Sequence, residues 1–374
     1  MSMSRCSVCQ RETPVTKTLP VCLDCIRAER AGIDCIIERA HSWRQRLFGL
    51  PVAIPRASTG VRCKVCNNQC CIPLNQLGYC GLRSNNNNRP SAKVSPSKAL
   101  MDYYLDPHIT NCCASYFCPG GTGIGHPQRA YRPGPEYGYA NLSVFFYGCS
   151  FDCLYCQNAS HKQLGEATSV GINQFIAIVD KEPRISCICY FGGSPEPQLP
   201  FAIRVLETCR ERFKDRILRQ CFEMNGNANS SLLKRAAILA TQTGGILKFD
   251  LKAYSDSVNR ALSGISNQAS LRNFAMLSDT LPFDDSTYPP LMATTLLVPY
   301  YVDENEVAAI AQFIKSLNRP TLEYSLLIFH PNHLMADLPV TPLRQAQRCY
   351  DAAKRYLTRV HVGNLGLLGG RLHL

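Results

Sequence analysis

The residues most able to do chemistry are Cys149, Cys153 and Cys156, a CxxxCxxC triplet directly after the apolar run NLSVFFY. Thiolates hold iron–sulfur clusters, and a [4Fe–4S] cluster has four irons. Three protein ligands leave one iron free to bind a reactant, just as an open position marks a catalytic zinc site. Zinc sites usually show two CxxC pairs instead. The triplet therefore predicts a reactive cluster, with half a zinc site or three unrelated thiols as the alternative.

Two sets of four cysteines precede the triplet. The first has the spacing CxxC, twelve residues, CxxC, which is typical of a zinc ribbon and predicts a structural zinc ion. The second permits either zinc or a second iron–sulfur cluster, and we expect zinc because four ligands leave no open position. The sets are Cys6, Cys9, Cys22 and Cys25, and then Cys63, Cys66, Cys70 and Cys80.

The remaining cysteines carry weaker signals. Cys112, Cys113 and Cys118 could bind a further cluster, or they could simply pack beneath the opening of the barrel that the later part of the chain predicts. Six others fall on predicted strand or helix faces, where a free cysteine behaves as a small apolar residue. These are Cys35, Cys187, Cys189, Cys209, Cys221 and Cys349.

The elements that must position these residues repeat from residue 141 onward. Short apolar runs, each followed by a segment able to form a helix, predict a parallel sheet with right-handed crossovers. We therefore expect an α/β fold with a complete or partial (β/α) barrel, whose chemistry gathers at the carboxyl ends of the strands. The runs are NLSVFFY, CICYF, LRQCFEM, ILKFDL, LMATTLLV and LEYSLLI.

The amino-terminal third lacks this repeated pattern. We therefore expect three parts, residues 1–60, 61–140 and 141–374. The first would combine the ribbon with a helix from about Ala28 to Leu47, where apolar residues recur at helical spacing. SNNNNRPS at Ser84 to Ser91 predicts an exposed loop. Gly120 to Gly138, rich in Gly and Pro, predicts a connector or a loop packed over another domain. In the last part, Asp303 is predicted to cap a helix.

Composition restricts the class of protein. The 374 residues are 45% hydrophobic and 18% charged. We see no long apolar span and no leader, and expect a soluble, cytoplasmic protein without membrane partners. The net charge of +12 is spread along the chain, so nucleic-acid binding is not favoured. Most of the 21 cysteines are clustered, which favours metal binding over a disulfide scaffold.

From Tyr79 to about Leu368 the chain resembles the radical S-adenosylmethionine (SAM) superfamily. The CxxxCxxC triplet and the GYCGLR segment point to the group related to pyruvate formate-lyase activating enzymes and the AmmeMemoRadiSam proteins. The resemblance implies that SAM chelates the open iron through its amino and carboxylate groups. One electron then cleaves SAM, and the 5′-deoxyadenosyl radical abstracts hydrogen. It also implies that Tyr155 shields the cluster.

The resemblance suggests where SAM would be bound. Gly192, Gly193 and Ser194, after CICYF, resemble the glycine-rich motif for the SAM amino group. The family commonly has an acidic residue at Ser194, which Glu196 could replace. Glycines let a backbone approach a ligand closely, which is consistent with a SAM-binding role for this segment. A plain turn is the alternative.

Other candidates follow the next strands. Asn225 and Asn227 could bind the SAM carboxylate or ribose, or an asparagine there could cap a helix. Asp250 and Lys252 resemble the Asp-Leu-Lys segment of glycyl-radical activating enzymes and are the candidate catalytic pair. A structural ion pair is the alternative, and Lys248 is another possible partner.

Two later segments also match. The turn at Pro299 is expected to line the adenine side of the SAM pocket, although Tyr300 stands where the family often has Gly. His330 is a candidate substrate contact or a packing residue.

These features predict a radical SAM oxidoreductase that acts on a protein, peptide or cofactor, with an electron donor such as flavodoxin or ferredoxin. The glycyl-radical activase is one alternative, supported by the DLK and NGN segments. The extra amino-terminal metal sites favour a modifying enzyme. A non-catalytic zinc protein is the rival from another class.

Overall fold

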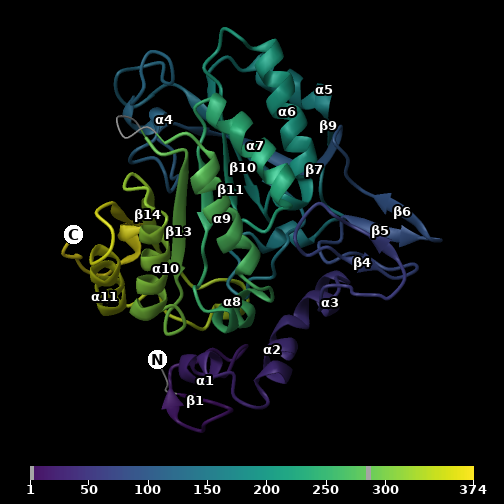
Figure 1. Cartoon of the computed structure of the whole chain (residues 1–374), viewed down its shortest axis with the longest axis vertical. Helices are drawn as coiled ribbons and strands as arrows, with labels where there is room; N and C mark the ends of the chain where they lie inside the picture. Colours follow the sequence, from purple (N-terminus) through teal and green to yellow (C-terminus); the bar gives the residue numbers. More distant parts are fainter. Residues whose placement is uncertain (1–3, 284–287) are drawn as a thin grey trace.

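The computed structural model describes residues 4–283 and 288–374. Its centre is a large sheet flanked by helices (Figure 1). This sheet has nine strands in the order β15-β14-β13-β12-β11-β10-β8-β7-β9. β15 and β9 form the two edges of this sheet within the described residues. The arrangement is a mixed α/β fold in which a parallel sheet forms a partial barrel, as the repeated strand and helix pattern predicts.

Seven neighbouring strands of the sheet are parallel. The six predicted strand-like runs all form strands, and their residues are mostly buried because helices and loops cover the sheet. A seventh strand, β15, was not predicted. The parallel strands are β8 (Ala140–Phe146), β10 (Ile185–Gly192), β11 (Arg219–Met224), β12 (Leu247–Asp250), β13 (Leu291–Leu297), β14 (Glu323–Ile328) and β15 (Val360–Gly363).

Helices connect and cover these strands. The predicted cap of α10 is confirmed: the Asp303 side chain accepts from the N–H groups of Asn305 and Glu306, both at 3.1 Å. Val307, Ile310 and Ile314 form its buried face. The helices are α5 (Ile172–Lys181), α6 (Leu199–Arg212), α7 (Ser230–Gln242), α8 (Asp256–Ser263), α9 (Gln268–Thr280), α10 (Glu304–Ser316) and α11 (Leu343–Lys354).

Two antiparallel strands extend the sheet beyond the predicted barrel. β7 (Lys98–Pro107) pairs with β8 from Met101↔Phe146 to Pro107↔Ala140, and β9 (Ser169–Gly171) pairs with β7. Sequence reasoning missed β7, because its outer half is largely exposed and lacks a periodic apolar pattern. Part of the segment 61–140 thus shares the sheet of the barrel, while the domain division at 141 stays a prediction.

The amino-terminal region is built from short elements. The single helix predicted from Ala28 to Leu47 is wrong: Gly32, with φ of 86°, precedes one helix, and Ser42 separates it from a second. The elements are β1 (Ser4–Arg5), β2 (Glu12–Thr13), α1 (Leu23–Arg27), α2 (Ile33–His41), α3 (Trp43–Phe48), β3 (Val61–Arg62) and β4 (Cys71–Ile72).

The asparagine-rich segment is a β-hairpin, where an exposed loop was expected. β5 (Arg83–Asn86) pairs with β6 (Arg89–Ala92), and Asn87 and Asn88 turn the chain with φ of 52° and 60°. Asparagine tolerates this left-handed conformation better than most residues do, which suits a two-residue hairpin turn. The residues of β6 are exposed as expected.

The segment from Gly120 to Gly138 begins inside the short helix α4 (Pro119–Thr122) and packs against the barrel. Its Glu136 side chain is fully buried and accepts from Arg219 at 2.8 and 2.5 Å. Ser186 Oγ and the Tyr131 N–H also donate to this carboxylate. Burial alone would raise the pKa of Glu136, but these hydrogen bonds and the Arg219 charge lower it overall.

Among the described residues, no helix has the length and apolar character needed to cross a membrane.

Replacing Glu136 tests this buried pair. Glu136→Gln leaves Arg219 buried without its charge partner, so we expect the free energy of unfolding to fall by about 3–5 kcal/mol. Because the folded-state pKa is depressed, the carboxylate contributes stability above its unfolded pKa of about 4.3, and this is lost as pH falls. Urea unfolding followed by circular dichroism at pH 7 and pH 4 measures both effects.

Asp180→Asn is the matched control, because Asp180 pairs with Arg212 on the surface and such pairs contribute under about 1 kcal/mol. Equal stabilities of the two variants at pH 7 would contradict the role given to Glu136.

Candidate functional site: a cysteine loop beside a barrel cavity

The cysteine triplet lies on the loop that follows β8, at the carboxyl end of that strand. Two N–H groups donate to Cys149 Sγ: the Phe151 backbone at 3.3 Å and the Asn225 side chain at 3.4 Å. Cys153 Sγ contacts Ser263 Oγ at 3.4 Å. N–H donors aimed at sulfur stabilise a thiolate, so these contacts fit a metal-bound Cys149.

The three thiols lie close enough to influence one another. Burial, followed by the neighbouring Cys153 charge, raises the pKa of Cys149 well above its ordinary value and that of Cys156 to about 11. Thiolates clustered in this way need a cationic group to hold them. In the described residues the triplet is not among the groups whose ligand atoms all lie within 4.8 Å of one another, so its spacing suits a larger iron–sulfur cluster better than a single metal ion.

Asp152, inside the loop, anchors it to the rest of the protein. Its carboxylate contacts His41 Nδ1 at 2.9 Å, Lys162 Nζ at 2.8 Å and Arg44 at 3.8 Å. Burial would raise the pKa of Asp152, but the hydrogen bond from His41 and the charges of Lys162 and Arg44 hold it far below its ordinary range. His41 comes from α2 and Arg44 from α3, so the amino-terminal helices hold the cysteine loop in place.

A cavity of about 510 Å³ opens beside the loop; we call it the upper cavity. It brings together five of the residues predicted to contact SAM, and Gln157 and Asn158, next to Cys156, line it too. Their gathering follows from the parallel sheet, whose strands all end at this edge. The five residues are Gly192, Gly193, Ser194, Asn225 and Asp250.

Gly192 and Gly193 serve packing within the protein. A Cβ on Gly193 would lie 2.3 Å from the Gly148 carbonyl oxygen, and one on Gly192 would lie 2.6 Å from the Phe146 nitrogen. Gly192 also has φ of 107°, which L-residues rarely adopt. The two glycines therefore let the end of β10 press against the loop that carries Cys149.

Asn227 lies outside the lining of the upper cavity. Its side chain donates to Asn68 Oδ1 at 2.8 Å, and Asn68 in turn donates to the Ser150 carbonyl at 2.8 Å. Its backbone N–H donates to Glu196 at 3.2 Å. These contacts tie the Cys63–Cys70 segment to the barrel. The helix-cap alternative is met by Asn229, which caps α7.

Glu196 does not line the upper cavity either. It is fully buried, and burial raises its pKa to about 7. The proposal that it replaces the acidic residue at Ser194 thus gains no support from its position.

Asp250 and Lys252 form an ion pair with 3.0 Å between Nζ and Oδ2. Asp250 lines the upper cavity, while Lys252 lies outside that lining. Thr294 Oγ1 donates to the other carboxylate oxygen of Asp250 at 2.5 Å. Lys248 pairs with Glu223 at 3.1 Å.

The later segments contribute less than expected. Tyr300 has φ of 67°, which explains why a glycine suits this place, but neither Pro299 nor His330 lines the upper cavity. Sequence reasoning missed other lining residues, notably Thr294, Ser325 and His361. Thr294 and Ser325 lie within predicted strands. The alternation of side chains between the two faces of a strand could have identified them as facing the cavity. His361 lies on the unpredicted β15.

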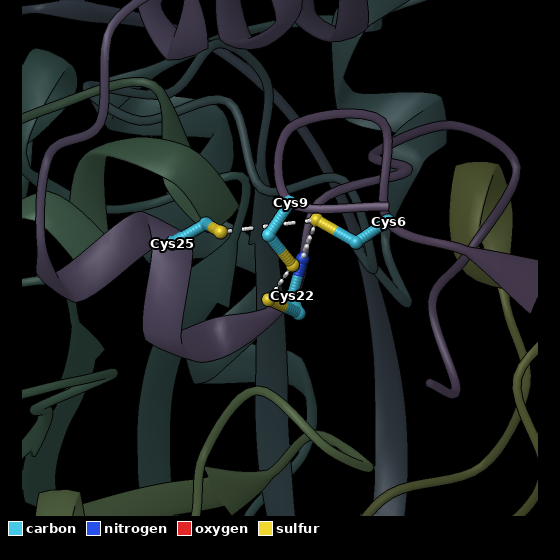
Figure 2. Close-up of side chains that lie close together, drawn as sticks. All are labelled: Cys6, Cys9, Cys22 and Cys25. Atoms are coloured by element: carbon cyan, nitrogen blue, oxygen red, sulfur yellow. Dashed lines mark hydrogen bonds between the residues drawn. The ribbon is translucent and has the colours of Figure 1, made fainter. Parts of the chain in front are cut away.

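The first four-cysteine set converges as expected for a tetrahedral metal ion. Figure 2 shows Cys6 and Cys9 from one turn facing Cys22 and Cys25 at the start of α1. The sulfur pairs Cys6–Cys25 and Cys9–Cys22 lie 3.9 and 3.8 Å apart. Zn–S bonds of about 2.3 Å in a tetrahedron give sulfur separations of about 3.8 Å. A hydrogen bond from Arg11 lowers the pKa of Cys9 to about 6.

The second set, Cys63, Cys66, Cys70 and Cys80, lines one small cavity. In residues 4–283 and 288–374, three or more His, Cys, Asp or Glu ligand atoms come within 4.8 Å of one another at two places, and this set is not among them. Its sulfurs are thus spaced more widely than those of the first set. Burial, then the charges of Cys80, Cys63 and Cys70, raise the pKa of Cys66 well above its ordinary value.

Comparison with protein families gives one family. Residues 143–314 match the model of the Radical SAM superfamily, which confirms the recognition made from the cysteine triplet. The matched range begins in β8 and ends in α10, so it contains the triplet and β10 to β13, while β14 and β15, which also line the upper cavity, lie beyond it.

Among curated proteins, the chain is similar to the isethionate sulfite-lyase activating enzyme of Desulfovibrio desulfuricans, with 30% identity over 140 residues. The match covers 37% of this chain and 40% of the relative. The chain thus spans about two fifths of the length of the relative that it matches.

Two solved structures give weaker likenesses. A domain of a pyruvate-formate lyase-activating enzyme from Bacteroides vulgatus has a TM-score of 0.38 and 18% identity, covering 47% of this chain and 98% of that one. SuiB of Streptococcus suis, bound to its precursor peptide SuiA, has a TM-score of 0.44 and 11% identity, covering 59% and 47%. At these TM-scores neither likeness supports an inference about function.

The zinc site expected at the first four-cysteine set can be tested by metal analysis. Cys9→Ser removes one of four thiolates, and we expect the purified protein to lose one equivalent of zinc and the amino-terminal region to loosen. Elemental analysis of the full chain measures the loss. Cys35→Ser, which changes an exposed cysteine, should keep the full zinc content, and equal zinc in both variants would contradict a zinc ribbon.

Asp152 makes a second prediction. Asp152→Asn preserves its shape but leaves Lys162 and Arg44 buried without a negative charge, so we expect a loss of about 3–5 kcal/mol in the free energy of unfolding. Anaerobically reconstituted protein should also retain less iron, because the cysteine loop is held less firmly. Iron analysis and urea unfolding measure the two effects. In Asp351→Asn, which alters an exposed carboxylate, both quantities should stay at the wild-type level, and wild-type values in Asp152→Asn would refute the anchor.

Proposed function

We propose that this chain, which carries a radical SAM superfamily match over residues 143–314, is an enzyme that cleaves SAM reductively and uses the resulting radical to abstract hydrogen from a protein, peptide or cofactor. The observation that carries this proposal is the position of the cysteine loop. The CxxxCxxC loop follows β8 and borders the cavity where Gly192, Ser194 and Asn225 gather.

Cys149, Cys153 and Cys156 are the proposed ligands of the [4Fe–4S] cluster. When bound, the cluster and SAM supply reductive cleavage of the sulfonium bond and a 5′-deoxyadenosyl radical. The protein contributes N–H donors to Cys149 Sγ, which tune the reduction potential of such a cluster. The buried Tyr155 is proposed to exclude water from it.

The upper cavity is the proposed place for SAM. Its volume of about 510 Å³ falls within the range of roughly 300–1,000 Å³ usual for cofactor sites. Asp250, held by Lys252 and Thr294, presents a fixed carboxylate able to accept from ribose hydroxyls or the SAM ammonium group. Asn225 and Ser194 add amide and hydroxyl groups. We propose Lys252 as a residue that positions Asp250, since Lys252 itself does not line the cavity.

Two hypotheses describe the substrate class. We favour a modifying enzyme that acts on a peptide, protein or cofactor, because the amino-terminal cysteine sets add metal sites to the barrel. A glycyl-radical activase is the second reading, and the relationship to an isethionate sulfite-lyase activating enzyme over 140 residues supports it. In both cases an electron donor such as flavodoxin or ferredoxin is proposed.

The cysteine sets at the amino terminus are proposed to be structural. A zinc ion suits Cys6, Cys9, Cys22 and Cys25, whose sulfur separations match a tetrahedron. The wider spacing at Cys63, Cys66, Cys70 and Cys80 favours a second iron–sulfur cluster over the zinc ion that we expected from the sequence, because a cluster is larger than a single ion.

Formation of 5′-deoxyadenosine tests the function. Protein reconstituted anaerobically with iron and sulfide, then given dithionite and SAM, should release it. The Cys149→Ala, Cys153→Ala, Cys156→Ala triple variant should release none, whereas Cys35→Ala should match wild type. Chromatography quantifies the product. Equal release from wild type and the triple variant would contradict the proposal, as would zinc in place of iron at the triplet.

A second measurement separates the two substrate readings. The activase reading predicts that a partner enzyme incubated with the reduced protein and SAM acquires a glycine-centred EPR signal. The modifying reading predicts a covalent change in the substrate without that signal.

A further inference from the structure

Six cysteines meet inside the barrel, below the proposed SAM site. A second cavity of about 430 Å³ adjoins the upper one, and we call it the lower cavity. Five cysteines line it, three from the neighbouring strands β10 and β11 and two from the loop between β7 and α4, while the sixth, Cys113, lines the upper cavity. The sequence suggested that the strand cysteines were apolar packing residues, but the structure turns them toward the lumen. The six are Cys112, Cys113, Cys118, Cys187, Cys189 and Cys221.

Three ligand atoms in this region are compact enough for one metal ion. Cys112 Sγ, Cys113 Sγ and a Glu223 oxygen all lie within 4.8 Å of one another. The Cys113 Sγ to Glu223 Oε1 distance is 3.5 Å. A tetrahedral zinc ion with Zn–S of about 2.3 Å and Zn–O of about 2.1 Å separates such ligands by about 3.6 Å. The spacing therefore fits a zinc ion already in this conformation.

The surrounding charges also fit a divalent ion. Lys248 is 2% exposed, and its ammonium group lies 3.1 Å from each of Cys112 Sγ, Cys189 Sγ and Glu223 Oε1. Two thiolates and a carboxylate would carry three negative charges, of which Lys248 balances one. A divalent cation balances the other two, so the assembly would be neutral at a site whose three proposed ligands are half-buried.

The backbone holds the cysteine pair in place. The Ala114 N–H donates to Cys112 Sγ at 3.4 Å, and the Ser115 N–H donates to the Cys112 carbonyl at 3.0 Å. Tyr116 stacks on His361 with 3.8 Å between ring centroids. The loop is thus fixed against β15 on one side, while Glu223 arrives from β11. The loop and β11 therefore bring their ligand atoms to the same point, as the elements of a preformed metal site do.

We propose that Cys112, Cys113 and Glu223 bind a zinc ion in the barrel lumen and leave its fourth position open to the upper cavity. All three residues line that cavity together with Asn225 and Asp250. Three protein ligands with an open position are the pattern of a zinc ion that binds a reactant. The open position would take a carboxylate, thiolate or imidazole group of a substrate that enters this cavity beside SAM. This site is separate from the cysteine triplet and does not depend on the radical chemistry.

Metal analysis of the full chain tests the site. The Cys112→Ser, Cys113→Ser double variant should contain one zinc per chain fewer than wild type, with iron and sulfide unchanged. Cys118→Ser is the control, because Cys118 lies on the same loop but outside the ligand set. Its sulfur accepts from the Gly121 N–H at 3.3 Å, a bond that serine can keep. Equal zinc in the double variant and the control overturns the proposal. So does loss of iron and sulfide in place of zinc, which would indicate a cluster.

Glu223→Gln provides a second measurement that keeps both thiols and the shape of the side chain. Competition with a chromophoric zinc chelator should show affinity weakened by more than about tenfold at this site, with circular dichroism and iron content as in wild type. Unchanged zinc affinity overturns the assignment of Glu223, and with it the three-ligand site. If the double variant fails to fold, this measurement decides. Zinc content and 5′-deoxyadenosine are independent readouts, so failure of this proposal is distinguishable from failure of the proposed function.

Discussion

The buried carboxylate of Asp152 is the contact on which the candidate active site depends. The loop buries the apolar side chains of Phe151, Leu154 and Tyr155, and it is also held by a charge. Asp152 meets His41, Arg44 and Lys162 inside the protein. Buried charges are costly unless they are paired, and this one is paired from three directions. The amino-terminal helices are therefore part of the support of the candidate active site.

The same principle organises the interior of the barrel. Three contacts there join a charged side chain to a group of opposite charge or to thiols. Glu136 and Arg219 join the connector to the sheet, Lys248 meets Glu223 and two thiols, and Asp250 meets Lys252. Because the parallel strands end at one edge, pairs on β11 and β12 come to lie beside the cysteine loop. The lumen consequently combines fixed charges with thiols, and this combination suits metal ions.

The sequence predicted the parts of the fold that have a regular pattern. Six parallel strands, the Asp303 cap and the compact cysteines of the ribbon all follow from local spacing, which the chain carries within a few residues. β7 and β15 lack such a pattern, and their places are set by pairing with distant strands. The hairpin at Asn87 differs from the expected loop, because composition alone does not show strand pairing. The helix break at Gly32 was similarly missed.

The candidate site was predictable only in part. Strand ends located Gly192, Ser194, Asn225 and Asp250 at one cavity, since parallel topology alone brings them together. Asn227 and Lys252 were placed there too, yet their side chains turn to Asn68 and Asp250. Side-chain direction after a strand end depends on tertiary neighbours, which the sequence does not reveal. For the same reason the lumen group of Cys112, Cys113 and Glu223 could not be seen, because it joins residues about a hundred positions apart.

EPR spectroscopy of the reduced protein tests the central claim most directly, because it reports whether SAM binds at the cluster. Anaerobic protein reduced with dithionite should show a [4Fe–4S] signal that changes when SAM is added. A variant with serine at Cys63, Cys66, Cys70 and Cys80 isolates the triplet from any second cluster. If its signal shifts with SAM, the triplet holds a cluster with an open iron beside the upper cavity. If a cluster signal is present and SAM leaves it unchanged, the assignment of the triplet as the SAM-binding site is wrong.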